Sequence, residues 1–314
     1  MTRACRAVAL AATLSLVATV ATAQDRLTVL LDWFVNPDHA PLVVAQERGI
    51  FAAHGLEVEL VAPADPNDPP KLVAAGQAEL AVGYQPQLHF LVNEGLPLMR
   101  VGTLVATPLN ALVVLADSDI RSVADLADRR IGYSVAGFED ALLGAMLEHN
   151  GLGLDDVELI NVNFSLSPAL MAGQVDAVIG AFRNFELNQM AIEGMPGRAF
   201  YVEEEGVPSY DELIFLARPD MAGDPRLGRF MQALTEAVQY LVNHPDESWA
   251  MFVAAYPELD DELNRRAWGD TLVRFALRPA ALDRGRYQRF ADFLAGRGLI
   301  DAPPPVERYA VGLD

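Results

Sequence analysis

The residues best suited to bind a ligand lie in one short loop near the amino-terminus. Residues 31–39 supply a carboxylate, an indole, an amide and an imidazole, from Asp32, Trp33, Asn36 and His39. Trp33 can stack on a flat ring, and Asn36 offers a donor and an acceptor to the edge of a heterocycle. Asp32 could pair with a ligand amine or orient His39, which could itself bond the ligand or cap the next helix. The loop is a candidate site for a small, flat, polar molecule; the alternatives are a core role for Trp33 and turn roles for Asn36 and Asp32.

The elements around this loop place it where α/β proteins collect binding residues. An alternating apolar run from Leu27 to Leu31 predicts a strand. A helix is expected near residues 40–51, with Pro41 at a first-turn position that needs no N–H. Ligands of such folds bind beyond the carboxyl ends of strands, next to helix starts. Strands alternate with helices along the chain, which predicts an α/β fold with mainly parallel sheets flanked by helices.

Two segments of the chain repeat one pattern. Residues 73–83 and 170–180 each read as a helix end, a glycine cap, a glutamine turn, an acidic residue and a buried strand that ends in glycine. The repeat predicts two lobes of similar build. Candidate contact residues follow each copy. They are Tyr84 and Gln85 after the first, and Phe182, Arg183 and Asn184 after the second, with Glu186 two residues further on.

These strand-end residues are expected to face a cleft. Tyr84 would present an amphipathic ring, and Glu186 could accept two hydrogen bonds from an aminopyrimidine-like donor pair unless it is a surface helix residue. Ser134, Gly137 and Phe138 belong to a loop that joins a strand to a helix. Free N–H groups at that helix start would donate hydrogen bonds to an anion or a carbonyl. The loop has neither a phosphate-binding glycine motif nor its lysine, so phosphate is not favoured.

Two segments, near residues 111–116 and 212–217, are expected to cross between the lobes. The predicted first lobe comprises residues 24–112 and 216–314, and the second comprises residues 113–215. Everything from about Pro225 onward is expected to be helical and to pack on the first lobe. This layout is typical of a hinged clamp that closes around its ligand.

The first 23 residues have the pattern of an export signal. Arg3 and Arg6 precede an apolar run over residues 7–20, and an A-x-A cleavage pattern follows at residues 21–23. We expect cleavage before Gln24 and a periplasmic mature protein, with an amino-terminal membrane anchor as the alternative. No later stretch approaches the length of a membrane span.

Composition excludes several classes of function. The one cysteine, Cys5, lies in the expected signal, so the mature chain would have no disulfide, thiol nucleophile or thiolate metal site. The five histidines show no zinc-site spacing, and we expect neither a metal nor another cofactor. The net charge of −20 argues against nucleic acid and anionic membranes as partners. We expect a monomer.

The loop at residues 31–39, the segment over residues 44–58 and the stretch Gly-Ala-Phe-Arg-Asn-Phe-Glu at residues 180–186 together resemble the NMT1/THI5-like family. The resemblance covers nearly the whole mature chain. It implies the two-lobed periplasmic binding protein type II fold and the role of an exported solute-binding component of an ABC importer. The ligand would then be a thiamine pyrimidine precursor (hydroxymethylpyrimidine or its formylaminopyrimidine relative), delivered to a permease in the inner membrane.

The resemblance also implies roles for individual residues. Trp33 and Tyr84 would flank the pyrimidine ring, and Asn36 and Glu186 would hydrogen-bond its edge. Arg183 stands where the family commonly has an aromatic residue. Binders of riboflavin, other pyrimidines, sulfonates or nitrate share the fold and remain alternatives. The family's enzyme branch makes the pyrimidine itself and carries a cysteine-rich motif that is missing here, so we expect no enzymatic activity.

Overall fold

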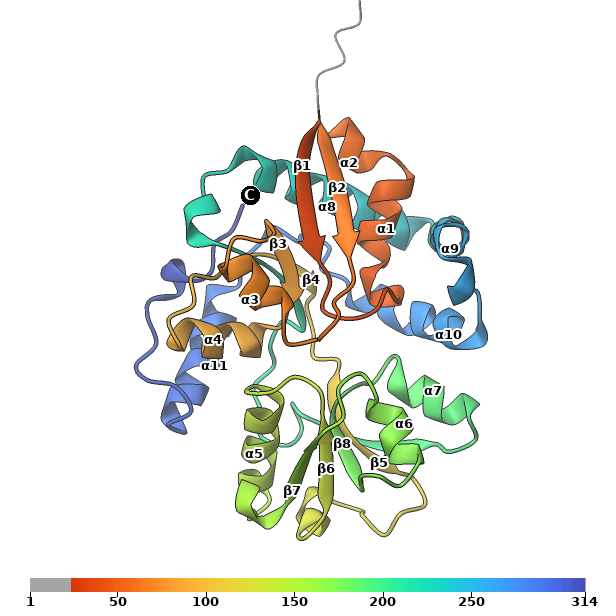
Figure 1. The fold of residues 1–314 in the computed structure, drawn as a ribbon, viewed down its shortest axis with the longest axis vertical. Coiled ribbons are helices and arrows are strands. Elements are labelled where there is room, and N and C mark those ends of the chain that lie inside the picture. Colours follow the sequence, from red (N-terminus) through yellow and green to blue (C-terminus); the bar gives the residue numbers. More distant parts are fainter. Residues whose placement is uncertain (1–23, 314) are drawn as a thin grey trace, which may run out of the picture.

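Two five-stranded sheets organise the chain, each with its own helices (Figure 1). The computed structural model describes residues 24–313, so the expected export signal at residues 1–23 lies outside the described part. The strand order is β2-β1-β3-β10-β4 in the first sheet and β7-β6-β8-β5-β9 in the second. We call each sheet with its helices a lobe.

The first lobe is built from both ends of the chain. Its amino-terminal part contains β1 (Asp25–Leu30), η1 (Pro37–His39), α1 (Ala40–Glu47), α2 (Ile50–Ala53), β2 (Leu56–Val61), α3 (Pro69–Ala74), β3 (Leu80–Gly83), α4 (Gln85–Asn93) and β4 (Met99–Val105). Its carboxyl-terminal part contains β10 (Leu213–Ala217), η4 (Pro219–Met221), α8 (Pro225–Asn243), α9 (Pro245–Ala255), η5 (Pro257–Leu259), α10 (Glu262–Thr271), η6 (Leu272–Arg274), α11 (Arg284–Gly296) and η7 (Val306–Arg308).

The second lobe is one continuous segment between these parts. It contains β5 (Asn110–Leu115), η2 (Val123–Leu126), β6 (Arg130–Tyr133), α5 (Glu139–His149), η3 (Leu154–Asp156), β7 (Glu158–Asn161), α6 (Leu166–Met171), β8 (Ala177–Phe182), α7 (Glu186–Ile192) and β9 (Gly197–Tyr201). Within the described residues, no helix is long and apolar enough to cross a membrane.

Each sheet has one antiparallel strand in the same relative place. β10 pairs antiparallel with β3 and β4, and β5 pairs antiparallel with β8 and β9. Both strands follow a passage of the chain from one lobe to the other, and each belongs entirely to one sheet. The chain therefore passes between lobes in the connections over residues 106–109 and 202–212. The expected lobe boundaries at residues 112 and 215 fall inside β5 and β10, where ladder hydrogen bonds hold the strand within a single sheet.

The predicted repeat is confirmed by equivalent contacts in the two lobes. In both copies the glycine after the helix has a positive φ, and the acidic residue accepts a hydrogen bond from the neighbouring strand. Glu79 Oε2 accepts from the Thr28 amide at 2.9 Å, and Asp176 Oδ2 accepts from the Arg130 amide at 2.9 Å. The acidic residue therefore ties the turn to the first strand of its lobe.

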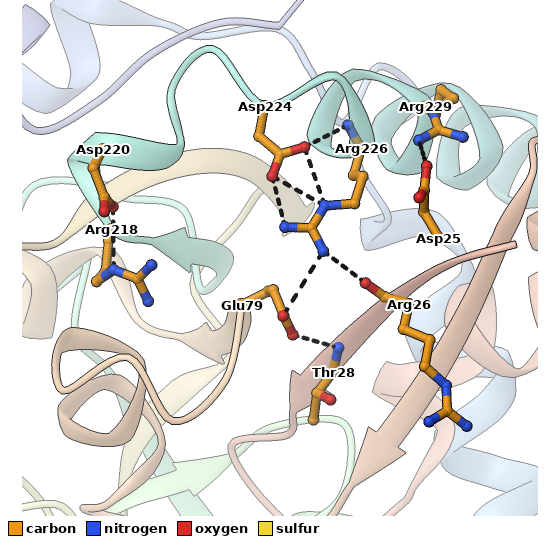
Figure 2. Close-up of polar contacts among 9 residues, drawn as sticks. All are labelled: Asp25, Arg26, Thr28, Glu79, Arg218, Asp220, Asp224, Arg226 and Arg229. Atoms are coloured by element: carbon orange, nitrogen blue, oxygen red, sulfur yellow. Dashed lines mark hydrogen bonds and ion pairs between the residues drawn. The ribbon is translucent and has the colours of Figure 1, made fainter.

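The start of α8 ties the carboxyl-terminal helices to the first sheet (Figure 2). Asp224 caps α8 by accepting from the Arg226 amide at 2.8 Å. The Arg226 guanidinium donates to the Arg26 carbonyl at 2.9 Å and lies 3.8 Å from Glu79. The expectation that these helices pack on the first lobe holds for α8, which contacts α1, whereas α10 also contacts α7 of the second lobe.

Candidate functional site

A narrow cavity of about 30 Å³ lies between the two lobes. Its walls come from the segments that follow β1, β3 and β6, from the start of α6, and from the end of β8 with the loop behind it. The lining residues are Asp32, Trp33, Asn36, Asp38, Tyr84, Glu139, Leu166, Gly180, Phe182, Phe185 and Glu186. The position agrees with the rule that ligands of α/β sheets bind beyond the carboxyl ends of the strands.

Half of the residues predicted as ligand contacts line this cavity. They are Asp32, Trp33, Asn36, Tyr84 and Glu186. The others lie behind its walls or in an adjoining loop, and these are His39, Ser134, Gly137, Phe138 and Asn184. Whether each contacts a ligand stays a prediction.

Asp32 is held by two protein partners. Its Oδ1 lies 2.9 Å from His39 Nε2, and its Oδ2 accepts from the Tyr84 hydroxyl at 2.9 Å. His39 Nδ1 accepts from the Asn36 amide at 3.3 Å, which assigns the ring proton to Nε2 and makes His39 the donor to Asp32. Burial and the nearby Asp32 raise the pKa of Tyr84, so its hydroxyl keeps its proton. Asp32 therefore orients Tyr84 and His39.

Asn36 has the turn role as well as a place in the cavity wall. Its Oδ1 accepts from the Asp38 amide at 2.8 Å, and its Nδ2 donates to the Phe34 carbonyl at 3.0 Å. These bonds cap η1. The local role limits Asn36 to one further donor hydrogen and one further acceptor lone pair for a ligand.

Aromatic rings from both lobes meet around the cavity. Tyr84 stacks on Phe138 of the second lobe, with ring centroids 4.9 Å apart and planes 28° apart. Phe182 meets Tyr84 edge-on at 6.4 Å. Trp33 makes an edge contact with Phe164 of the second lobe at 4.5 Å. Flat apolar surfaces of this kind suit a ring-shaped ligand.

The loop expected to offer free N–H groups is already occupied. Glu139 Oε2 accepts from the amides of Ser134 at 2.7 Å and Val135 at 3.1 Å. The expectation of an anion site at this helix start is wrong for these two groups, because the chain's own carboxylate fills it. Gly137, with φ +93°, shapes the same loop but does not line the cavity.

Two further carboxylates, those of Glu186 and Asp38, line the cavity. In each of them, one oxygen accepts a hydrogen bond from the protein. Glu186 Oε2 accepts from the Phe182 amide at 2.7 Å. Asp38 Oδ1 accepts from Asn184 Nδ2 at 2.7 Å and lies 3.0 Å from Thr271 Oγ1. Within residues 24–313, the second oxygens of Asp38, Glu139 and Glu186 accept no hydrogen bond from another residue. Three carboxylate oxygens on three segments therefore stand available to a ligand.

Burial makes these carboxylates hold protons more tightly than usual. Loss of water raises the pKa of Glu139 to about 8, that of Glu186 to about 7 and that of Asp38 to about 6. Among the described residues that line the cavity there is no Lys or Arg. The arrangement favours a ligand that donates hydrogen bonds or carries positive charge, and it disfavours an anion.

Gly180 makes room for one of these carboxylates. A Cβ at residue 180 would overlap the Glu139 carboxylate, and φ is +97°. Glu139 and Gly180 were not predicted as contacts, nor were Asp38, Leu166 and Phe185, whereas Phe182 was named as a candidate beside its strand end and does line the cavity. The one usable sequence signal was that Glu139, like Glu186, begins a helix after a strand-end loop. Within the described residues, no three His, Cys, Asp or Glu side chains are grouped to hold a metal ion.

Comparison with known proteins agrees with this geometry. The model of the family described as "NMT1/THI5 like" matches residues 36–248. The chain belongs to the NMT1/THI5-like family. A protein of Haemophilus influenzae named for thiamine biosynthesis is 53% identical over 293 residues, covering 93% of both chains. A formylaminopyrimidine-binding protein of Halalkalibacterium halodurans is 35% identical, covering 72% of this chain and 69% of its own.

More distant members of the family include enzymes. A 4-amino-5-hydroxymethyl-2-methylpyrimidine phosphate synthase of Uromyces fabae is 29% identical, covering 77% of this chain and 74% of its own. The fold itself is shared with a solved Candida albicans protein described as having the generic periplasmic binding protein fold. That structure has a TM-score of 0.71 at 18% identity, covering 92% of this chain and 96% of its own. The chain has the periplasmic binding protein fold, as predicted.

Proposed function

We propose that the protein is the solute-binding component of an ABC importer and that it binds an aminopyrimidine precursor of thiamine between its lobes. The observation that carries the proposal is the set of three available carboxylate oxygens, on Asp38, Glu139 and Glu186, in a cavity walled by aromatic rings. A hydroxymethyl- or formylaminomethyl-substituted aminopyrimidine supplies two hydrogens from its amine and a third from its hydroxyl or amide. The free oxygens of Asp38 and Glu186 can accept from these hydrogens. Glu139, which keeps its proton and whose Oε2 accepts from two amides, presents an O–H that can donate to a ring nitrogen.

The electrostatics of the cavity weigh against the anionic alternatives. A sulfonate or nitrate requires donors or positive charge, whereas the described lining offers carboxylates and neither Lys nor Arg. The amides of Ser134 and Val135, which would suit an anion, already serve Glu139. Placing an anion beside these buried carboxylates would cost several kcal/mol unless they took up protons.

The binding role is favoured over the synthase role of the family's enzymes. The formylaminopyrimidine-binding relative is more similar to this chain than the synthase reported above, at 35% against 29% identity. The only cysteine of the sequence is Cys5, within the expected export signal, and the synthase branch is the one marked by a cysteine-rich motif. We further propose a periplasmic location, an inner-membrane permease as partner, and a monomer.

A ligand panel tests the proposal. Thermal unfolding of the full chain is followed with 4-amino-5-hydroxymethyl-2-methylpyrimidine, formylaminopyrimidine, thiamine, riboflavin, taurine and nitrate. A ligand at a hundredfold excess over its dissociation constant stabilises the native state by about 2.7 kcal/mol. We expect a rise in Tm with the aminopyrimidines. A rise with taurine or nitrate alone would overturn the ligand class.

A further inference from the structure

Helix α10 of the first lobe reaches the second lobe beside the cavity. It contacts η1, which carries Asp38, and α7, which begins at Glu186. Figure 1 shows α10 at the edge of the first lobe, facing α7 across the gap between the lobes. The last residue of α10, Thr271, is fully buried although its hydroxyl is polar. A buried hydroxyl needs partners.

The partners of Thr271 form a closed triangle that spans the two lobes. Asn184 Nδ2 donates to Thr271 Oγ1 and to Asp38 Oδ1, both at 2.7 Å, and Thr271 Oγ1 lies 3.0 Å from Asp38 Oδ1. Each of the three residues is at most 2% exposed. Asp38 and Thr271 belong to the first lobe and Asn184 to the second, so two sides of the triangle break when the lobes separate.

The triangle also fixes the carboxylate that faces the cavity. Asn184 and Thr271 both engage Asp38 Oδ1, which leaves Oδ2 as the oxygen available to a ligand. Thr271 has one hydroxyl hydrogen, which can go either to Asp38 Oδ1 or to the Ala267 carbonyl of its own helix at 2.7 Å. The position of α10 thus sets the orientation of Asp38.

A second polar contact between the same helices lies outside the buried region. Asn188 Nδ2 donates to Asp270 Oδ2 at 2.8 Å, in an exposed position. Because solvent replaces an exposed hydrogen bond when it breaks, this contact contributes little to closure. Asn188 Nδ2 also donates to the Asn184 carbonyl at 2.9 Å, so the control for the buried triangle removes the exposed Asp270 and leaves Asn188 in place.

We propose that Thr271 is a positioning residue that holds the lobes closed over the cavity through Asn184 and Asp38, and so sets the rate of ligand release. The choice of probe ligand rests on the proposed function, whereas the triangle does not. Opening the lobes removes Asn184 from two buried partners, and that loss opposes opening. A side chain without the hydroxyl lowers this barrier.

Release kinetics test the proposal with T271V, which keeps the shape but removes the hydroxyl, and with T271S, which restores it. Dissociation of 4-amino-5-hydroxymethyl-2-methylpyrimidine is followed by stopped-flow tryptophan fluorescence. We expect T271V to release the probe about tenfold faster, with the association rate within twofold of wild type. T271S and D270A are expected to stay within twofold in both rates. Equal release rates for T271V and wild type would overturn the proposal.

A ligand-free measurement separates this proposal from the proposed function. Spin labels are placed at E193C, after α7, and at E258C, in η5 before α10, in a chain that also carries C5S. We expect T271V to populate longer distances between the labels and T271S to match the parent chain. If the probe ligand fails to bind wild type, the proposed function fails and the distances still decide the role of Thr271. Unchanged distances in a folded T271V, judged by its Tm, would contradict that role.

Discussion

The carboxylate of Glu139 occupies the space that a side chain at residue 180 would fill. Gly180 lies within β8 and has φ +97°, and its amide donates to Asn110 Oδ1 at 3.0 Å. A Cβ there would overlap the Glu139 carboxylate. One glycine on the second sheet therefore permits one buried acid in the cavity wall.

Replacing this glycine is expected to disrupt the binding site. G180A adds a methyl group against Glu139 and forces a positive φ on alanine, a backbone strain of roughly 1–3 kcal/mol. G173A is the matched control, because Gly173 has φ +69° but open space around its Cβ position. We expect both variants to lose stability in thermal unfolding and only G180A to lose at least tenfold in aminopyrimidine affinity. Equal affinities for the two variants would refute the link.

The three available carboxylates are expected to contribute separately to ligand affinity. A hydrogen bond to a charged group is worth about 1.5–3 kcal/mol, so D38N should weaken aminopyrimidine binding roughly 10- to 100-fold. E139Q and E186Q replace carboxyl groups whose pKa values are raised to about 8 and about 7, so each should cost a neutral hydrogen bond of about 0.5–1.5 kcal/mol, or roughly 2- to 10-fold in affinity. E193Q, at the exposed end of α7, changes the same charge away from the cavity. Calorimetric titration compares the four variants with wild type. If a variant of a cavity residue bound the ligand as tightly as E193Q does, the residue changed in that variant would not belong to the binding site.

The stability of the ligand-free protein is expected to depend on Glu139 and pH. Because the folded-state pKa of Glu139 is raised from 4.5 to about 8, the folded state keeps a proton that the unfolded state loses between pH 4.5 and 8. The contribution of Glu139 is therefore favourable at low pH and falls as pH rises through this window, by up to about 1.4 kcal/mol per pH unit.

Denaturant unfolding of wild type and E139Q at several pH values measures this dependence. E139Q lacks the titrating group, so its free energy of unfolding should rise relative to that of wild type as the pH goes from 5 to 8. E193Q, which changes an exposed carboxylate, serves as the control. A constant difference between wild type and E139Q across this range would mean that Glu139 does not hold its proton.

The hydroxyl of Tyr84 is expected to stabilise the fold through Asp32. Y84F removes the donor to Asp32 Oδ2 and should lower the free energy of unfolding by about 1–3 kcal/mol, because Asp32 is buried. Y256F removes a half-buried hydroxyl elsewhere in the same lobe. We expect Y256F to change stability by no more than about 0.5 kcal/mol. Similar stabilities for the two variants would show that the Tyr84–Asp32 hydrogen bond contributes little to the free energy of unfolding.

Local patterns in the sequence were sufficient to predict the fold and five residues that the structure places in the cavity wall. Strand–helix alternation predicted the α/β class, and the two glycine-acid turns predicted the repeat that Glu79 and Asp176 confirm. Asp32, Trp33 and Tyr84 were predicted because each directly follows a strand expected to end at the cleft. These features depend on residues close in sequence, so they can be predicted without the structure.

The missing parts of the site depend on pairs of residues far apart in the chain. The helix start at Glu139 was visible, but its use of the Ser134 amide depends on the fold of the intervening loop. Gly180 and Glu139 meet only because β8 lies beside β6 in the second sheet. Thr271 reaches Asp38 across 233 residues. The periodicity of a single sequence does not predict contacts between residues so far apart in the chain.

The central claim is that the cavity selects donors, and one calorimetric comparison tests it most directly. The full chain is titrated with 4-amino-5-hydroxymethyl-2-methylpyrimidine and with the analogue that carries a 4-oxo group in place of the amine. Loss of the amine leaves buried acceptors without partners, which a site built for hydrogen bonding tolerates poorly. We predict that the oxo analogue binds at least about 100-fold more weakly. Equal affinities, or preference for the oxo analogue, would contradict the account.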